Sequence, residues 1–398
     1  MLEYKSVLAQ EVLTACRLRK NRARIQQGVI NCAYSSALFV AKLVSLMRVD
    51  LRTNAIRAGL EALYFSGAHA VAQHFFGGVG AILTMHRVRE HQRGQFQPND
   101  LLEITPAFLE DIVTGFKRAG VDIIDLDEAV DRLRDGNHAR RFVVLTFDDG
   151  YVDNHAVAWH ALRRMKVPFT IYVPTAFPEG HGKLWWTALE RIIAGRDMIV
   201  VEIEGQRRLL ETRRADDKYQ AYAALHRWLR TLSPVEQEKE ITSLCALYGV
   251  DLDALCRELI MNWTQIQELA GDPRVTIGAH SVNHFSLAGL SEQQARFEMR
   301  ESANVIETTT GVRPRHFSFP YGWVDAAGPR EFRLAREEGY ATAVTTRPGL
   351  LFSDHARHLT ALPRVSLNGR FQKKRYVDVL MSGLPTYVYN RFERCNVA

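Results

Sequence analysis

Residues 145–150, Leu-Thr-Phe-Asp-Asp-Gly, place two adjacent carboxylates at the end of an apolar run that begins at Phe142. The run predicts a buried strand, and Gly150 makes the turn out of that strand easy. Neighbouring side chains on a regular strand point to opposite faces, so Asp148 and Asp149 can share one pocket only where the chain is leaving the strand. Reactive groups collect at such strand ends in α/β folds, so the stretch predicts an α/β fold with a site here. For an isolated Asp-Asp-Gly the alternative is a solvated turn.

Two histidines follow a second predicted strand. Residues 275–279 are apolar and small, and they run into His280-Ser-Val-Asn-His284. Imidazoles four residues apart converge on one point if the chain turns helically after His280. Two neutral imidazoles and one carboxylate make the ligand set of a catalytic zinc site, which keeps one coordination position open. A structural role beside a surface turn is the alternative for this pair.

A third stretch, Phe317-Ser-Phe-Pro-Tyr-Gly322, is a short strand interrupted by a proline. The proline forces irregular backbone whose amide groups are free to face a ligand. An ordinary strand with a Pro-Tyr-Gly turn is the alternative. The three stretches, in this order, resemble the motifs of the polysaccharide deacetylase family, whose catalytic unit is the NodB homology domain of the carbohydrate esterase family 4 type. The resemblance spans about residues 81 to 367.

The resemblance implies a role for each matched residue. Asp148 matches the general base of the family, and Asp149, His280 and His284 match its metal ligands. Tyr321 matches the residue whose backbone N–H helps to hold the oxyanion. The implied cofactor is a divalent metal, first Zn²⁺, with Ni²⁺, Co²⁺, Fe²⁺ and Mn²⁺ as alternatives.

Two departures from the family pattern change which residue is expected to act as the general acid. Ser318 stands where many members carry an arginine, and Arg364 stands where a late motif, here residues 362–365, usually supplies an acidic histidine. Arginine cannot deliver a proton at neutral pH, so Arg364 is assigned to substrate binding. A branch of the family that acts on exopolysaccharides carries a histidine on its first strand. Residues 81–88 resemble that strand and nominate His86 as the catalytic acid, with a structural histidine at the barrel rim as the alternative.

Charge and composition bound the partners. The net charge is +6, of which +5 falls in residues 1–50, so the remaining chain is nearly neutral. A nearly neutral body fits an uncharged, acetylated glycan and argues against nucleic acid. Five scattered cysteines indicate a reducing compartment without a disulfide framework, so the expected location is the cytoplasm. Weak contact of the basic N-terminus with the inner membrane is the alternative to a solvated arm.

No transmembrane span or signal peptide is expected. The uncharged stretches at residues 25–41 and 63–85 contain several polar side chains, and the second is interrupted by Gly77-Gly78. No clear cleavage site of small residues follows the first apolar stretch.

The chain divides into four predicted regions. These are a basic N-terminal extension (1–50), a packing helix (51–80, apolar from Thr53 to about His74), a barrel (81–370) and a basic C-terminal tail (371–398) to which no elements are assigned. Repeated strand–helix units predict a parallel barrel. The family resemblance implies an irregular (β/α)7 barrel. Predicted strands include residues 143–147, 169–173, 275–279, 317–319, 341–345 and 362–367, and a capping box of Ser291 with Gln294 predicts a helix to Thr310.

Residues 185 to about 270 interrupt the strand–helix rhythm. Residues 209–269 are charged and helical in pattern, which predicts an inserted helical subdomain. Trp185 and Trp186 lie at its entrance. A tryptophan pair belongs either to a core or to a surface that stacks on sugar rings; Trp185 is assigned to substrate binding, as is Pro320 beside Tyr321.

The implied activity is metal-dependent hydrolysis of the amide bond of N-acetylhexosamine residues in an oligo- or polysaccharide, of the chitooligosaccharide deacetylase type. The metal would activate water, Asp148 would take the proton, the Tyr321 amide would help to hold the oxyanion and His86 would protonate the leaving amine. A glycan O-acetyl esterase and a catalytically silent glycan-binding protein are the alternatives. Adjacent aspartates cannot flank a glycosidic bond at the required separation of about 5 Å or more, which argues against a glycoside hydrolase.

Overall fold

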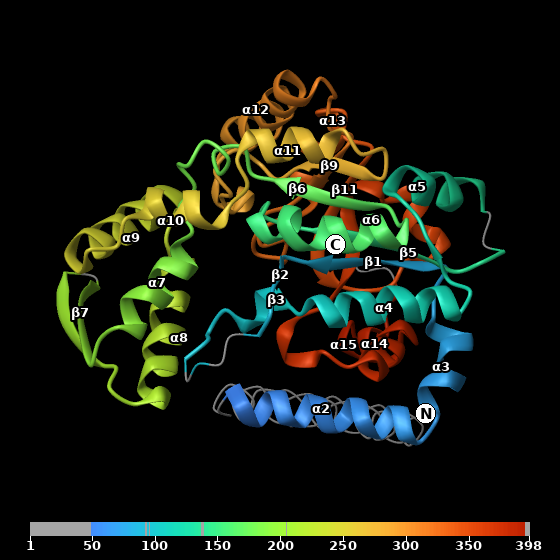
Figure 1. The fold of residues 1–398 in the computed structure, drawn as a ribbon, viewed down its shortest axis with the longest axis horizontal. Coiled ribbons are helices and arrows are strands. Elements are labelled where there is room, and N and C mark those ends of the chain that lie inside the picture. The colour runs from blue at the N-terminus through green and yellow to red at the C-terminus, as the bar shows by residue number, and fades with distance from the viewer. Residues whose placement is uncertain (1–48, 92–93, 95, 137–138, 204, 395–398) are drawn as a thin grey trace, which may run out of the picture. The chain divides into compact units, whose positions relative to one another are not determined.

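A computed structural model describes residues 49–91, 94, 96–136, 139–203 and 205–394 (Figure 1). The chain divides into two units, residues 1–59 and residues 60–398. Helix α2 (Val49–Phe65) begins in the first unit and ends in the second. Residues 1–48 of the predicted basic extension, with their predicted membrane contact, lie outside the described residues. Within the described ranges, no helix has the length and apolar character needed to cross a bilayer.

Seven parallel strands close into a barrel, which confirms the predicted (β/α)7 fold. The ring closes because β1 pairs with β5 in parallel register over its whole length, from Gly80 opposite Phe142 to Met85 opposite Phe147. A short strand, β4 (Asp122–Ile123), pairs with β5 outside the ring. In spatial order the ring contains β1 (Gly80–Met85), β12 (Leu362–Ser366), β11 (Thr342–Pro348), β10 (His316–Ser318), β9 (Val275–Ala279), β6 (Phe169–Val173) and β5 (Phe142–Phe147).

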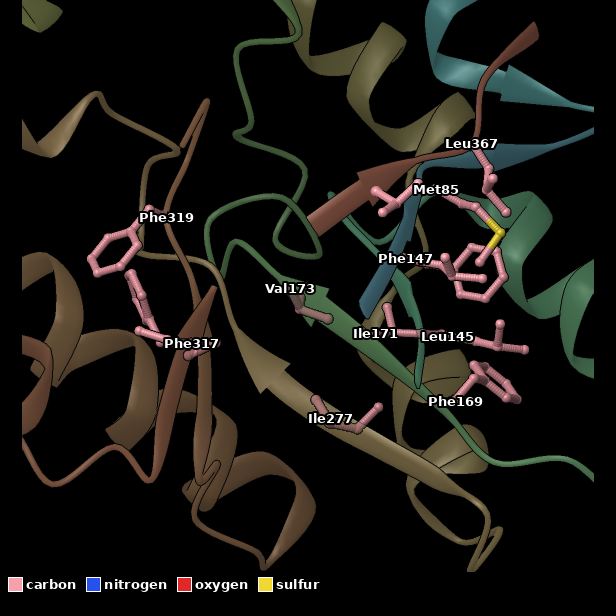
Figure 2. Close-up of a cluster of buried hydrophobic side chains, with 14 of the residues drawn as sticks. Met85, Leu145, Phe147, Phe169, Ile171, Val173, Ile277, Phe317, Phe319 and Leu367 are labelled. Atoms are coloured by element: carbon pink, nitrogen blue, oxygen red, sulfur yellow. The ribbon is translucent and has the colours of Figure 1, made fainter. Parts of the chain in front are cut away.

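Alternate residues of five strands belong to two different apolar layers. Leu145 and Ile171, labelled in Figure 2, and Leu83 pack in the large cluster that includes the apolar face of the helices around the barrel. Their neighbours Ile82, Val144 and Tyr172 belong to another cluster, which contains side chains of β1, β5, β6, β11 and β12. Because side chains alternate along a strand, the second set faces the barrel interior. Strands apolar on both faces are typical of parallel sheets covered by helices.

Capping residues set the ends of the helices that surround the barrel, and those of α12 lie where the sequence predicts. Thr105 caps α4 by accepting a hydrogen bond from the Phe108 N–H (3.2 Å), and Ser291 with Gln294 forms the predicted capping box of α12. Gly311 ends α12 with a positive φ of 76°, a conformation that costs glycine little. These helices are α4 (Pro106–Arg118), α5 (Leu126–Asp135), α6 (His160–Met165), α12 (Glu292–Thr310) and α13 (Pro329–Glu337), and a π-helical segment (Asn154–Trp159) precedes α6.

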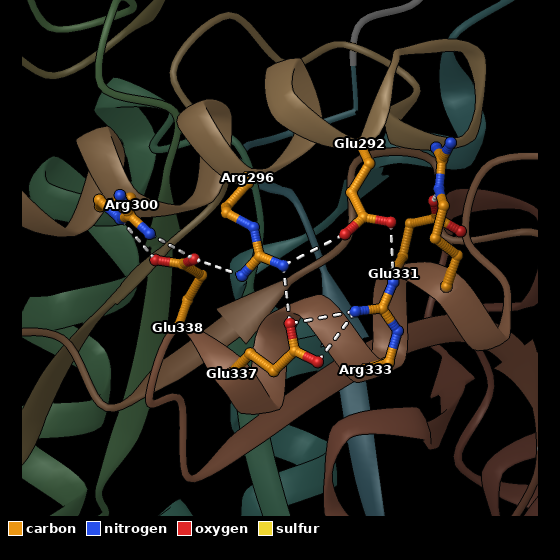
Figure 3. A network of polar contacts seen from close by, with 8 residues as sticks. Glu292, Arg296, Arg300, Glu331, Arg333, Glu337 and Glu338 are labelled. Carbon is orange, nitrogen blue, oxygen red and sulfur yellow. Dashed lines mark hydrogen bonds and ion pairs between the residues drawn. The ribbon is translucent and has the colours of Figure 1, made fainter.

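An ion-pair network joins α12 to α13 (Figure 3). Arg296 and Arg300 of α12 both donate to Glu338, whose side chain is only 5% exposed. Arg333 of α13 donates back to Glu292 at the start of α12 (2.8 Å). Single exposed pairs contribute little, whereas a network around a buried carboxylate holds two helices in register.

The insert contains a hairpin that the sequence analysis missed. Residues 185–270 form α7 (Trp185–Ala194), β7 (Met198–Ile203), β8 (Gln206–Glu211), α8 (Ala215–Thr231), α9 (Pro234–Tyr248), α10 (Leu252–Leu259) and α11 (Trp263–Ala270). The helical prediction for residues 209–211 is therefore wrong. The run Ile199-Val200-Val201 is β-branched and pairs antiparallel with β8, with Gly205 at φ 71° in the turn. Residues of α7 to α10 share an apolar core of their own.

Two predictions at the ends of the chain need correction. The single packing helix expected from Thr53 to His74 is two helices, because Gly67 (φ 72°) separates α2 from α3 (Ala68–Phe76). The tail expected without elements contains α14 (Lys374–Met381) and α15 (Leu384–Tyr389). The basic residues of the tail made it look like a polar segment, but α14 has an apolar face. Tyr376 and Val379 are buried on it, and Arg375 is paired with Glu61.

Candidate active site and metal centre

Four strand ends bring the predicted site residues together at one end of the barrel. His86 follows β1, Asp148 and Asp149 follow β5, His280 follows β9, and Tyr321 lies three residues beyond β10. Because all seven strands are parallel, their carboxyl ends meet at the same rim.

Asp149, His280 and His284 form a compact buried cluster. Their potential ligand atoms all lie within 4.8 Å of one another. The Asp149 Oδ1 is 3.4 Å from the His280 Nε2 and 3.2 Å from the His284 Nε2. All three side chains are at most 8% exposed.

The donor set of this cluster fits a divalent metal ion. The His280 Nδ1 lies 2.6 Å from the Ser318 carbonyl oxygen, so this nitrogen donates its proton there and the Nε2 lone pair faces Asp149. No described residue makes a hydrogen bond to the buried Asp149 Oδ1, although a buried carboxylate oxygen is costly without a partner. Burial raises the pKa of Asp149, but His284 and His280 outweigh it and hold the pKa well below its usual range. Burial also lowers the pKa of His284, which favours the neutral, metal-ligating imidazole.

Strained backbone is concentrated in this cluster and beside it. Seven described residues other than glycine have positive φ, and four of them are Asp149 (72°), Ser281 (64°), His284 (60°) and Tyr321 (62°). The helical turn expected after His280 is therefore wrong: left-handed residues bring the two imidazoles to a ring separation of 4.9 Å. Such conformations persist only where the surroundings impose them.

Glu298 of α12 imposes the shape of the histidine turn, a role that the sequence analysis missed. Its carboxylate accepts hydrogen bonds from the Val282 N–H (2.9 Å), the Asn283 N–H (2.9 Å) and the Asn283 amide (2.6 Å). Glu298 is 4% exposed and lies on the apolar face of α12. A charged residue at an apolar position of a helix was the signal that could have found it.

Arg364 and Ser318 hold the carboxylate of Asp148. The Arg364 guanidinium donates to both Asp148 oxygens (2.8 and 2.6 Å), and its Nη2 also contacts the Ser318 Oγ (3.1 Å). Burial raises the pKa of Asp148, but Arg364 outweighs it, so the pKa lies below its ordinary value. Arg364 is 1% exposed, and its guanidinium is bonded to Asp148, to Ser318 and to the Thr345 carbonyl oxygen, so the structure makes it a partner of the base where the sequence assigns it to substrate binding.

His86 is held through its backbone. The Asn154 side-chain amide donates to the His86 carbonyl oxygen (2.7 Å), and the Asp153 carboxylate accepts from the Val88 N–H (2.8 Å) and from Arg87 (2.9 Å). The π-helical segment that begins at Asn154 is of a kind frequent at functional sites. The imidazole is close enough to contribute to the lowered pKa values of both aspartates of the site.

Tyr321 is one link between the insert and the site, and Trp186, whose ring centroid lies 5.3 Å from that of His284, is another. The Trp185 Nε1 donates to the Tyr321 Oη (2.9 Å), and the Arg230 guanidinium lies 4.1 Å from the Tyr321 ring centroid. The opposite neighbour is His284, at a ring separation of 4.9 Å. Burial raises the pKa of the Tyr321 phenol to about 12, so the phenol stays protonated.

The turn around Tyr321 leaves its amide available. The Gly322 N–H donates to the Pro320 carbonyl oxygen (2.7 Å), which closes a three-residue turn with Tyr321 at its apex. Among the described residues, no acceptor is bonded to the Tyr321 N–H. Pro320 therefore serves the site through its backbone.

Both tryptophans at the insert entrance are core residues. Trp185 is 3% exposed and Trp186 is 5% exposed. The Trp186 Nε1 donates to the buried Tyr151 Oη (3.0 Å) as Trp185 does to Tyr321. The structure therefore places Trp185 behind Tyr321 rather than on a surface open to a sugar ring.

Comparisons with known proteins found similar chains among deacetylases. The relative "Putative polysaccharide deacetylase YxkH" of Bacillus subtilis (strain 168) is 28% identical over 102 residues, which are 26% of this chain and 35% of that protein, so the chain matches about a third of its length. The Streptococcus pyogenes deacetylase PplD in complex with acetate is similar with a TM-score of 0.48 at 17% identity, covering 73% of this chain and 92% of that one. IcaB from Ammonifex degensii is similar with a TM-score of 0.47 at 18% identity, covering 76% and 96%.

The family comparison covers the central part of the barrel sequence, from β5 to β10, and most of the insert. The family model named "Polysaccharide deacetylase" matches residues 135–246 and 253–341, which together are just over half of the 398 residues. These ranges contain both aspartates, both histidines and the Tyr321 turn. The chain belongs to the polysaccharide deacetylase family.

Proposed function

We propose that this protein is a metal-dependent hydrolase that removes N-acetyl groups from N-acetylhexosamine residues of an oligo- or polysaccharide, in the manner of the exopolysaccharide deacetylases. The observation that carries the proposal is the buried cluster of Asp149, His280 and His284 directly beside the carboxylate of Asp148. A hydrolase needs an activated water and a base within reach of it.

Asp149, His280 and His284 would hold the metal, most readily Zn²⁺, given two imidazoles and one carboxylate. When bound, such an ion acts as a Lewis acid and lowers the pKa of water. The chain's own contribution is the fixed tautomer of His280 and the turn held by Glu298. Both keep ligand lone pairs aimed at one point.

Asp148 would accept the proton of the attacking water. Arg364 keeps this carboxylate ionised at neutral pH and fixes its orientation through two hydrogen bonds. Each carboxylate oxygen has a second lone pair, so the pairing leaves Asp148 able to accept a proton.

The Tyr321 N–H would stabilise the oxyanion that forms on the acetyl oxygen. A single well-placed donor of this kind lowers the activation barrier by about 3 kcal/mol. The insert serves this step, because Trp185 and Arg230 fix the Tyr321 side chain.

His86 would protonate the leaving amine. Histidine is the side chain most often used as a general acid, whereas a guanidinium does not release its proton in proteins. Asn154 and Asp153 hold the backbone of residues 86–88 and so set where the ring lies.

A catalytically silent glycan-binding protein is the less favoured alternative. That alternative rests on the missing arginine of the third motif, but the Arg364 guanidinium reaches the Ser318 hydroxyl at that position. A charged partner for the base is thus present, supplied by another strand.

Product analysis tests the proposed function. The zinc-loaded protein should release acetate and an equal amount of free amine from N-acetylglucosamine oligomers. Acetate with a free hydroxyl, from O-acetylated glycans alone, would make the protein an esterase. Retained metal without acetate from any acetylated glycan would contradict catalysis altogether.

A further inference from the structure

We propose that an exposed apolar face at the amino end of the barrel docks on an anionic lipid surface and holds the protein at a membrane. The face consists of Val71, Phe75, Val388, Tyr389 and Phe392, which we call the docking face. The proposal goes beyond the proposed function and does not depend on catalysis.

Two neighbouring segments carry the docking face. Helix α3 packs on α15 through the rings of Phe76 and Tyr387, which stack at a centroid separation of 4.5 Å. The Tyr387 ring also lies 5.6 Å from the Phe392 ring. The Arg394 guanidinium donates to the Phe75 carbonyl oxygen (3.1 Å). Segments that are more than 300 residues apart in the sequence therefore lie side by side.

The docking face is apolar although it is open to solvent. Val71 and Phe75, one helical turn apart on α3, are 64% and 63% exposed. Val388, Tyr389 and Phe392 are 53%, 59% and 66% exposed. A single exposed apolar side chain is ordinary on a protein surface, whereas five on two packed segments form a patch that marks an interaction site.

The docking face lies at the end of the barrel opposite the metal-ligand cluster. Helix α3 leads through Gly77 to Gly80, the first residue of β1. Arg141, directly before β5, donates to the carbonyl oxygens of Gly77 (2.5 Å) and Met381 (2.7 Å). The catalytic groups follow the carboxyl ends of β1 and β5, which contain six residues each and are therefore about 20 Å long. A surface bound to the docking face would leave the catalytic rim open.

Charge favours an anionic lipid as the partner. The net charge of +6 divides into +6 for residues 1–76, −4 for residues 77–368 and +4 for residues 369–398. The chain on either side of the barrel and insert is thus basic, while the barrel and insert are acidic. Basic side chains attract anionic headgroups, and exposed aromatic side chains beside them enter the lipid interface.

A second copy of the chain fits the docking face less well. Beside the face, Arg391 and Arg394 outnumber one acid, Glu393, so a two-fold dimer would bring like charges together. Residues 1–50 carry +5 and would meet the same repulsion if they covered the face. A layer of anionic headgroups meets neither objection, and the basic residues 1–50 add to the attraction.

Co-sedimentation of the full chain with vesicles tests the proposal. The wild type should bind vesicles of equal parts phosphatidylcholine and phosphatidylglycerol at least about tenfold more tightly than vesicles of phosphatidylcholine alone. Phe75→Ser/Phe392→Ser should lower the partition coefficient on the mixed vesicles at least about tenfold, because two rings are removed from the interface. Arg391→Gln should lower it about fivefold, the scale of one basic residue at an anionic surface.

Control variants separate the docking face from general surface effects. Phe297→Ser/Val235→Ser removes two apolar side chains of similar exposure (57% and 69%) from α12 and α9 and should bind like the wild type. Arg208→Gln, at an exposed position of β8, is the control for charge. Val71→Ser/Val388→Ser repeats the test on other residues of the face. A thermal unfolding midpoint equal to that of the wild type checks the fold of each variant.

Loss of binding in both docking-face double variants, with wild-type binding in the controls, would support the proposal. Unchanged binding in these variants would overturn it and leave any lipid contact to residues 1–50. Equal binding to neutral and mixed vesicles, or no binding to either, would also overturn it. So would a wild-type dimer in light scattering that becomes monomeric in Phe75→Ser/Phe392→Ser, because a second copy would then cover the face.

Discussion

The role of Arg364 follows from its contacts in the fold and not from its place in the sequence motif. In the sequence, Arg364 stands where the family usually has a histidine that acts as general acid, and the sequence analysis assigns Arg364 to substrate binding. In the structure it is a buried partner of Asp148 and touches Ser318, the residue that replaces the expected arginine. A motif residue missing from one strand can be supplied by a neighbour, because the strand ends of a barrel converge.

Replacing Arg364 with methionine should leave Asp148 as an unpaired buried charge. The wild-type pKa of Asp148 is lowered, so the pair contributes stability above the unfolded pKa of the aspartate and loses it as pH falls. We expect Arg364→Met to lower the free energy of unfolding by about 3–5 kcal/mol at pH 7. The deficit should shrink at pH 5, where the now raised pKa lets Asp148 protonate.

Chemical denaturation at the two pH values measures this effect. Arg347→Met controls for the loss of a buried arginine, because Arg347 is also buried (2% exposed) and donates to the Ala327 carbonyl oxygen (3.0 Å). The same deficit at both pH values in Arg364→Met would show that Asp148 does not depend on Arg364.

His86→Ala tests the assignment of the acid. The variant should keep its fold and metal but lose most turnover of an amide substrate, because an amine leaves poorly without a proton. Turnover of 4-nitrophenyl acetate should suffer much less, since its leaving group needs little protonation. Wild-type rates on the amide would mean that another group protonates the amine.

At the scale of elements, helix α12 links stability to the metal site. Its outer face is tied to α13 by the arginine–glutamate network, and its inner face carries Glu298, which holds residues 282 and 283. The turn that presents His280 and His284 is thus fixed by a helix that follows it in the chain.

Glu298→Gln should weaken metal binding about 10- to 100-fold, the scale expected when hydrogen bonds that orient metal ligands are lost, without unfolding the protein. The amide keeps one acceptor oxygen, so it can satisfy only part of the three bonds that the carboxylate accepts. Competition with a chelating dye measures the affinity. Glu307→Gln, at an exposed position of the same helix, is the control, and equal affinities in the two variants would contradict the role of Glu298.

At the scale of the whole molecule, the sequence predicts the features that depend on short stretches of chain, such as buried strands and helix ends. The strands at 142–147, 169–173 and 275–279 are continuous apolar runs, which buried parallel strands require. The ends of α12 follow from Ser291 and Gly311 alone. The grouping of Asp149, His280 and His284 was predictable because motif spacing and family resemblance point to the same three residues.

Features that depend on long-range contacts were not predictable. The pairing of Arg364 with Asp148 joins residues 216 positions apart, and nothing in either neighbourhood signals it. The β7–β8 hairpin was obscured by charged residues on β8, and α14 by the basic run before Tyr376. Ser281 and His284 adopt left-handed backbone although neither is glycine, so the sequence does not signal this conformation. Glu298, which lies on α12, holds the turn in this shape.

In the proposed mechanism, Asp149, His280 and His284 bind the metal, while Asp148 accepts the proton of the attacking water. The most direct test measures bound zinc and acetate release together in the wild type, His284→Ala and Asp148→Asn. The wild type should bind one zinc and lose activity reversibly on chelation. His284→Ala should lose zinc and activity together, whereas Asp148→Asn should keep zinc and lose about 10² or more in kcat. Full zinc occupancy in His284→Ala, or loss of zinc in Asp148→Asn, would contradict the account.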